Sequence, residues 1–246
     1  MLKIITIITK FILVALSALL FASCNYSVNS KSIRGSGQVT TENRTVEEDF
    51  KSIEVSNGID LVVEQADKTE IIVEADDNLQ NSITTKVDNG VLIITSDYNH
   101  FINIESKKVT VRMPIIEDLR ASSASSITSA NTLKGENISL RASSAANINV
   151  KIESDEVNCK SSSGSTITVE GLALHLDAVA SSGSNIDGYK LLANEVTAKS
   201  SSGSSIQVHP IVSLKATASS GSSISYNNTP HSIEKKSSSG GSIDRE

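Results

Sequence analysis

Apolar and polar residues alternate in a pattern that recurs along the second half of the chain. Each copy of the pattern closes on an isoleucine, and successive isoleucines lie 18 to 21 residues apart. Small or aliphatic residues stand eight and ten positions before most of them, with charged or polar residues between. A period of two is typical of a β-strand with one buried face. The seven closing residues are Ile127, Ile148, Ile167, Ile186, Ile206, Ile224 and Ile243.

A short phrase rich in serine and glycine precedes each of these isoleucines. The position four residues before the isoleucine is always Ser, and the next is Ala124, Ala145 or, in the five later copies, Gly. We interpret the phrase as a bend, where Gly allows positive φ and the Ser hydroxyl bonds to the backbone or to neighbouring copies. A disordered Ser/Gly linker is the alternative, but it does not explain the regular isoleucines.

A short strand repeated at this period cannot bury its apolar face alone, whereas stacked copies can. The predicted fold class is therefore all-β: a single-stranded parallel β-helix, or solenoid, with coils of about 19 residues. Right-handed is the expected hand, although the pattern itself does not fix it. Each Ile would pack on the Ile of the next coil, about 4.8 Å away. In the last copy Lys235 replaces the inward residue, as suits a terminal edge.

Residues 50–113 also read as strands, separated by turn signals. The stretch "VDNGVLII" around Asn89-Gly90 predicts a hairpin. We expect broader, less regular opening coils with one local hairpin. Four acids stand near the turns, and we interpret them as turn residues, with a cation site as the weaker alternative. They are Asp76, Asp77, Asp88 and Asp97.

The N-terminal sequence predicts a targeting signal rather than a folded element. Lys3 and Lys10 flank the start of an apolar run, and "FASC" places small residues directly before Cys24. Residues 1–23 are therefore predicted to be a lipoprotein signal peptide, with Cys24 as the lipidated residue. An ordinary secretory signal is the alternative, and Phe21 departs from the Leu usual in such a cleavage motif. Residues 24–46 are polar and predict a flexible tether before a domain at 47–246.

These features predict a protein anchored to a membrane by lipid, because the apolar run is too short for a conventional span. The expected location is the outer membrane, on the periplasmic side or at the cell surface. With Cys24 lipidated, Cys159 has no partner, so neither a disulfide nor a cysteine-based metal site is expected.

Four segments of the chain resemble those of a known protein family. The segments "FKSIEVSNGIDLVVEQ", "EIIVEADDNL", "VDNGVLIIT" and "VTVRMPIIEDLRASSASSI" are similar, in the same order, to the head GIN domain of DUF2807 proteins, described as auto-transporter adhesins. Gly58-Ile59-Asp60 stands where the family has Gly-Ile-Asn. The resemblance implies a β-helix-like domain on a secreted or lipid-anchored protein, frequent in Bacteroidetes. It transfers no catalytic residues.

Candidate chemistry is sparse, so no catalytic residue, metal site or cofactor is predicted. The four His residues share no ligand spacing, and no Gly-x-Ser-x-Gly elbow occurs. The outward positions of the regular copies carry Lys, Arg, Ser and Thr rather than aligned acids. The formal net charge is −6 and aromatic residues make up 3% of the chain, which argues against nucleic acid as a partner.

One loop departs from this pattern. "DYNHFIN" brings Tyr98, His100 and Phe101 together in a chain poor in aromatic residues, which makes it a candidate binding loop. The alternative is that Phe101 caps the solenoid core. If the loop binds, replacing Tyr98 and Phe101 by Ala weakens partner binding and leaves thermal stability intact.

The sequence therefore predicts a non-enzymatic module of the cell envelope, an adhesin or binding protein that presents a rigid solenoid surface to a protein or glycan. A polysaccharide-acting β-helix enzyme, a lyase or hydrolase, is the alternative, and carboxylates clustered on one face would favour it. A structural spacer is a third interpretation. The sequence does not set the oligomeric state.

Overall fold

The computed structural model of this protein describes residues 31–246 together with Ile8, Lys10, Ile12 and Val14. The chain divides into two compact units, 1–31 and 32–246, and the second contains the β-structure. The predicted lipidation residue Cys24 lies outside the described residues, as does nearly all of the predicted signal peptide. Among the described residues, no helix is long and apolar enough to cross a membrane.

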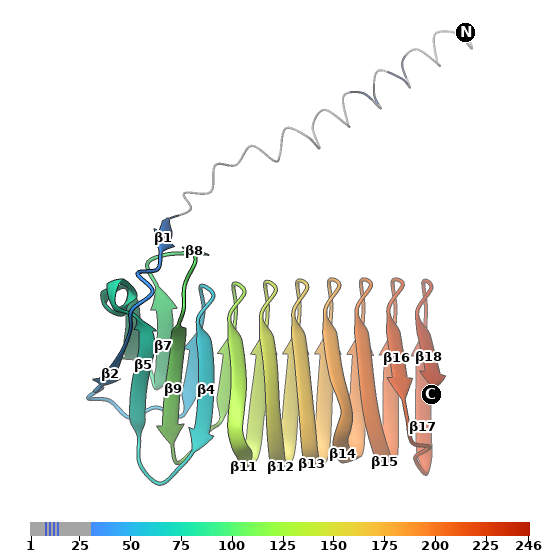
Figure 1. Cartoon of the computed structure of the whole chain (residues 1–246). Coiled ribbons are helices and arrows are strands. Elements are labelled where there is room, and N and C mark those ends of the chain that lie inside the picture. The colour runs from blue at the N-terminus through green and yellow to red at the C-terminus, as the bar shows by residue number, and fades with distance from the viewer. Residues whose placement is uncertain (1–7, 9, 11, 13, 15–30) are drawn as a thin grey trace. The chain divides into compact units, whose positions relative to one another are not determined.

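The second unit is built from coils stacked side by side (Figure 1). Each long strand bends near its middle, so that its first part lies on one sheet, the front face, and its last part on the opposite sheet, the back face. A tight turn leads from the back strand of one coil to the front strand of the next. The strands of this part are β10 (Asp118–Ala121), β11 (Ser126–Ala142), β12 (Asn147–Ser161), β13 (Thr166–Ala180), β14 (Asn185–Ser200), β15 (Ser205–Ala218), β16 (Ser223–Tyr226), β17 (Ser232–Ser237) and β18 (Ser242–Arg245).

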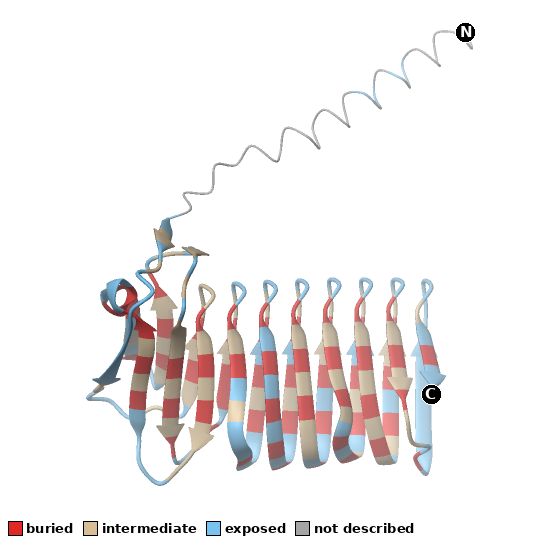
Figure 2. Ribbon diagram, in the orientation of Figure 1, coloured by how far each residue is buried: buried red, intermediate tan, exposed pale blue. Residues whose placement is uncertain are grey.

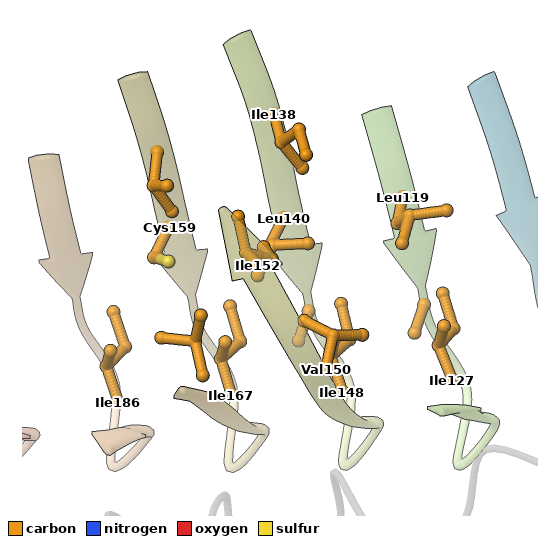
Figure 3. Packing of buried hydrophobic residues seen from close by; sticks show 14 of the residues in the cluster. Leu119, Ile127, Ile138, Leu140, Ile148, Val150, Ile152, Cys159, Ile167 and Ile186 are labelled. Carbon is orange, nitrogen blue, oxygen red and sulfur yellow. The ribbon is translucent and has the colours of Figure 1, made fainter. Parts of the chain in front are cut away.

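The strand register confirms the predicted parallel solenoid. Ile127 pairs with Ile148, Ile148 with Ile167, and the pairing of isoleucine with isoleucine continues without a slip to Ile243. Figure 3 shows the first of these side chains stacked in the interior. All seven are buried, and full burial of one such side chain contributes about 1.5–3 kcal/mol before entropic costs.

The back sheet supplies a second buried column opposite the isoleucines. It runs from Leu119 through Leu140, Cys159 and Ala178, so the side chains become smaller toward the C-terminus. Figure 2 shows buried positions alternating with more exposed ones along most of β12, β13, β14 and β15, as the period of two predicts. The core is a thin aliphatic layer between two sheets, and its sequence signature is the alternation itself.

The regular stack begins two coils earlier than the repeat indicates. On the back face β10 pairs in parallel with β3 (Ser52–Val55), and β3 with β7 (Val91–Ser96). On the front face β11 pairs with β4 (Asp60–Gln65), and β4 with β9 (Lys107–Met113). Leu61 and Val109 thereby continue the isoleucine column. These coils keep the register of the column but have Leu and Val in place of Ile, so the spacing of the isoleucines does not reveal them.

Antiparallel strands flank the first coils. β6 (Ile83–Asp88) and β7 form the predicted hairpin, with positive φ at Asn89 and Gly90. β5 (Glu70–Asp76) lies antiparallel to β9, and β2 (Val39–Arg44) antiparallel to β5, two pairings that the sequence did not predict. A 3-10 helix, η2 (Asp77–Ser82), joins β5 to β6.

Part of the segment predicted to be a tether, residues 24–46, forms two short strands. β1 (Ser32–Arg34) pairs in parallel with β8 (His100–Ile102), and β2 adds to the sheet through β5. Neither strand carries an apolar alternation of its own. Their hydrogen bonds are completed by strands far away in the sequence, which the local pattern cannot reveal.

Candidate binding surfaces

The Ser-Gly phrases form the turns between the back and front faces. In one of them Ser163 and Gly164 have φ values of 54° and 72°, and the Ser165 N–H donates to the Ser162 carbonyl at 3.3 Å. Two successive positive φ values define a type I′ turn. The Gly164 N–H also donates to the Ser182 carbonyl of the next coil at 3.1 Å. The turns are therefore bonded to one another.

The serine whose hydroxyl bonds to the backbone is not the serine predicted from the sequence. The serine four residues before each Ile, such as Ser163, is exposed at the tip of the turn. The buried one stands two residues before the Ile: Ser165 Oγ accepts from the Ser162 N–H at 3.0 Å and donates to the Ala142 carbonyl of the previous coil at 2.9 Å. The same pair of bonds recurs at Ser125, Ser184, Ser204 and Ser222.

The motif Gly58-Ile59-Asp60 belongs to an earlier copy of this turn. Gly58 has φ 71°, and its N–H donates to the Ser123 carbonyl at 2.9 Å. Ile59 is buried where later turns have the buried serine. The Asp60 carboxylate accepts from Lys107 Nζ at 2.8 Å and from Ser126 Oγ at 2.7 Å. The motif thus joins the first irregular coils to the regular ones.

On the back face, the register places cationic residues in one outward column, here called the basic column. Its consecutive rungs are Arg120, Arg141, Lys160, Val179, Lys199, Thr217 and Lys236. Five of the seven rungs are cationic in a chain whose net charge is −6, so the column is a local region of positive charge.

A hollow of about 560 Å³ lies over the first rungs of the basic column. Arg120, Arg141 and Lys160 line it, with Glu54 and Val179 as further neighbours. The serines that open the turns contribute the remaining polar wall. They are Ser122, Ser143, Ser162 and Ser181.

The arginines of the column are partly neutralised, whereas its lysines are not. The Asp118 carboxylate, only 8% exposed, accepts from Arg120 Nη2 at 2.6 Å and lies 3.3 Å from Arg141 Nη1. Glu54 lies 3.6 Å from Arg120. Within the described part of the chain, Lys160, Lys199 and Lys236 make no ion pair.

Lower on the back face the structure collects a histidine and carboxylates, contrary to the expectation that no acids align. Glu156, His175 and Glu195 occupy successive rungs of one column, and His175 Nδ1 lies 3.3 Å from Glu195 Oε2. They line a hollow of about 250 Å³ with Asp177. Among the residues that the structure describes, no group of His, Cys, Asp or Glu could hold a metal ion.

Exposed aliphatic side chains gather at the bend between front and back strands. Leu172 pairs with Leu192 on the next coil, and both are exposed, at 53% and 40%. Leu174 and Ile211 line the same hollow of about 510 Å³. We call Leu172, Leu174, Leu192 and Ile211 the aliphatic ridge.

The predicted binding loop is ordered. Phe101 packs against the hydrophobic core, with Lys107 Nζ 5.9 Å from its ring centroid, as the capping alternative describes. Tyr98 is half-buried and His100 is exposed within β8. Partner binding by these three residues remains a prediction.

Cys159 is fully buried in the back column and, among the described residues, is a free cysteine. Burial, with a smaller contribution from Asp177, raises the pKa of its thiol to about 12. A thiol held in this form is unreactive, so its role is packing.

The family model described as "Putative auto-transporter adhesin, head GIN domain" (DUF2807) matches residues 49–230. The chain belongs to this family. The match includes the hairpin, the Gly58-Ile59-Asp60 turn and all but the last coil, so the fold and the family agree over the same residues. A family of adhesin type indicates a protein of the cell envelope or surface, and nothing in its description indicates an enzyme.

Solved structures share the fold of this head GIN chain. A "putative adhesin" from Bacteroides fragilis is 21% identical with a TM-score of 0.81, over 87% of this chain and 100% of that one. A "putative adhesin" from Parabacteroides merdae is 21% identical with a TM-score of 0.69, over 88% and 100%. A "Putative lipid binding protein" from Parabacteroides distasonis is 20% identical with a TM-score of 0.72, over 88% and 100%. No curated protein matches the sequence.

Proposed function

We propose that this head GIN chain is a non-enzymatic envelope lipoprotein, held to the outer membrane by lipid on Cys24, that binds a protein or glycan through its back face. The observation that carries this proposal is the hollow lined by Arg120, Arg141 and Lys160. It combines exposed charge, hydroxyl groups and a concave surface, which are the features of a recognition site.

The coil architecture supports a binding role because it fixes the spacing of surface side chains. Every back strand is hydrogen-bonded to strands of the neighbouring coils, and every turn to the next turn. A ligand that meets such a surface does not have to order the protein backbone, so less conformational entropy opposes binding.

The enzyme alternative has one structural feature in its favour, the His175–Glu195 pair. The two side chains are 54% and 58% exposed. A general base works best where water is excluded and its substrate is held against it, and this exposed pair lacks such surroundings. We therefore favour binding over catalysis.

The test uses the Ser32–Glu246 unit, which contains the whole core, in a pull-down from envelope extract alongside a glycan array. The unmodified unit should retain a protein or glycan that R141Q/K160Q retains at least severalfold less, since each lost charge pair weakens a surface contact modestly. A Tyr98→Ala/Phe101→Ala variant tests the loop in parallel. Empty pull-downs and arrays would contradict the proposal, and degradation of an array glycan would support the enzyme alternative.

Anchoring is tested separately in the intact cell. Cys24→Ser should remove labelling by a radioactive fatty acid and shift the protein out of the membrane fraction, since the lipid on Cys24 is the proposed anchor. Continued labelling of the variant would refute lipidation at this residue.

Contact with lipid is a second candidate function, favoured by the aliphatic ridge. Exposed leucines on adjacent coils form an apolar surface of the kind that marks interaction sites, and one structural neighbour is described as a lipid-binding protein. Leu172→Ser/Leu192→Ser should then reduce sedimentation of the Ser32–Glu246 unit with phosphatidylcholine vesicles. Equal sedimentation of both forms would exclude this role for the ridge.

A further inference from the structure

We infer that the basic column binds a linear anionic polysaccharide whose chain lies along the solenoid axis, across successive coils. This inference rests on the proposed binding function and names the chemical class of the ligand.

The cations of the basic column repeat at the spacing of the coils. Neighbouring strands lie about 4.8 Å apart, and Arg120, Arg141 and Lys160 occupy three consecutive rungs. Lys199 and Lys236 follow at every second rung. Six coil steps separate the ends of the column, so it extends over about 29 Å. A ligand that contacts all of it must be long, straight and regularly charged.

A column of serine hydroxyl groups runs beside the cations. The serine that opens each turn stands two residues after the rung of the basic column, and all seven copies keep it. Within the described residues, the hydroxyl groups of this column make no hydrogen bond to protein, and the first six serines are half-buried. A hydroxyl can both donate and accept, so the column can bind sugar hydroxyl groups and carboxylates. The column consists of Ser122, Ser143, Ser162, Ser181, Ser201, Ser219 and Ser238.

The two columns together distinguish a polysaccharide from other polyanions. An extended peptide presents same-side residues about 6.6 Å apart, which falls out of step with the coils after a few rungs. Single-stranded nucleic acid is held by stacking on aromatic side chains, and the hollow is lined by none. A uronic-acid polymer advances by a length close to the coil rise for each ring, and it carries a carboxylate and hydroxyl groups on every ring.

The lysines are available to such a ligand. Lys160 and Lys199 are exposed and have no ion pair in the described chain, whereas Asp118 holds Arg120 from within the fold. An incoming carboxylate can therefore pair with the lysines without breaking an internal bond. Many such weak contacts along one chain add up to useful affinity.

The experiment measures binding of the Ser32–Glu246 unit to polygalacturonate and to neutral dextran. K160Q/K199Q removes two unpaired charges of the basic column, and K68Q/K190Q removes the same charge from exposed lysines outside it. We expect K160Q/K199Q to bind polygalacturonate at least about fivefold more weakly than the parent, and K68Q/K190Q to bind it like the parent. Neither variant should bind dextran. Affinity should fall with added salt. It should rise with oligomer length up to about seven rings, one for each rung of the basic column.

Several results would overturn the inference. Equal loss in both variants would show that only net charge matters, and equal affinity for dextran would show that charge does not matter. Binding to vesicles of phosphatidylglycerol in place of the polymer would identify a lipid surface instead. If polygalacturonate fails to bind while the envelope pull-down still retains a partner, this inference fails and the proposed binding function stands. If both fail, the proposed function is refuted as well.

Discussion

Ala124 and Ala145 adopt φ values of 60° and 61° in the first two regular turns, where later turns have glycine. A left-handed conformation costs an L-residue about 1–2 kcal/mol. These turns keep the geometry because the turn N–H groups are bonded to carbonyls of the next coil, as from Ala145 to Ser163. The stack thus imposes a backbone conformation that the local residues disfavour.

The positive φ values at these turn positions predict opposite effects on stability for a matched pair of substitutions. Ala145→Gly should stabilise the protein by up to about 1 kcal/mol, because relief of the strained φ outweighs the greater flexibility of glycine in the unfolded chain. Gly203→Ala should destabilise it by about 1 kcal/mol. Gly203 has φ 69° and an added Cβ would meet no atom within 4 Å, so no clash contributes. Urea unfolding measures both, and equal signs for the two changes would contradict the argument.

At the scale of elements, the ordered N-terminal strands are fastened by one buried carboxylate. Asp76, at the end of β5, accepts from the N–H groups of Gly37, Glu105 and Ser106 at 2.9, 3.0 and 3.0 Å. Gly35 passes so close that a Cβ there would lie 2.3 Å from Asp76 Oδ2. One side chain therefore links the segment before β2, the end of β5 and the segment before β9. This is a specific role for a residue that the sequence marked only as a turn acid.

Burial raises the pKa of the Asp76 carboxyl, but the backbone hydrogen bonds, that from Ser106 first, together lower the pKa by more than burial raises it. The net pKa therefore lies below its ordinary value of about 4. A carboxyl whose folded pKa is depressed stabilises the fold above the unfolded pKa and loses this effect as the pH falls through the folded pKa. We expect the hydrogen-exchange protection factors of Val39–Arg44, which correct for the intrinsic slowing of amide exchange in acid, to fall below about pH 4.

The variant Asp76→Asn should lower these protection factors at neutral pH, because an amide cannot accept all three bonds. Asp77→Asn, an exposed neighbour, is the control and should exchange like the parent. If acid still lowers the protection factors of Val39–Arg44 to the same extent in Asp76→Asn, the effect belongs to other carboxyls.

At the scale of the whole molecule, each coil of the regular part contacts mainly the coil before and the coil after it. β12, β13, β14 and β15 pair in sequence and in parallel, and the register shifts only locally, near Thr168 and between Gly188 and Glu195. The stability of such a stack is close to a sum of coil terms and nearest-neighbour interfaces. The molecule should therefore tolerate a change in the number of coils better than a change in the length of one coil.

Deletion of 168–186 removes 19 residues and joins Ile167 to Asp187, which keeps every later residue in its column. We expect a folded, shorter solenoid with a lower free energy of unfolding. Deletion of 168–177 instead removes half a coil and places Ala178 after Ile167, so the next turn no longer reaches the turn side. This variant should lose cooperative thermal unfolding. Circular dichroism during a thermal ramp distinguishes the two, and equal behaviour would argue against register as the organising constraint.

The sequence alone was sufficient for the regular coils, because their information is local. Period-two alternation selects the strand, the serine and glycine positions mark the turn, and like residues recur once per coil, so stacking follows from burying one face. The hairpin at Asn89-Gly90 was predictable for the same reason, since its turn residues are adjacent. The places of Leu61 and Val109 in the isoleucine column were not predicted, because these coils keep the register but not the residue type.

Tertiary structure decided what depends on residues distant in the sequence. β1 and β2 are strands only because β8 and β5 complete their hydrogen bonds, and Asp76 became a buried acceptor only when three separate segments met around it. The His175–Glu195 pair and the aliphatic ridge likewise exist only as neighbours across coils, whereas the regular repeat already aligns the cations of the basic column. A sequence states which side of a strand a residue faces, whereas contact across the stack depends on how far each coil shifts against the next.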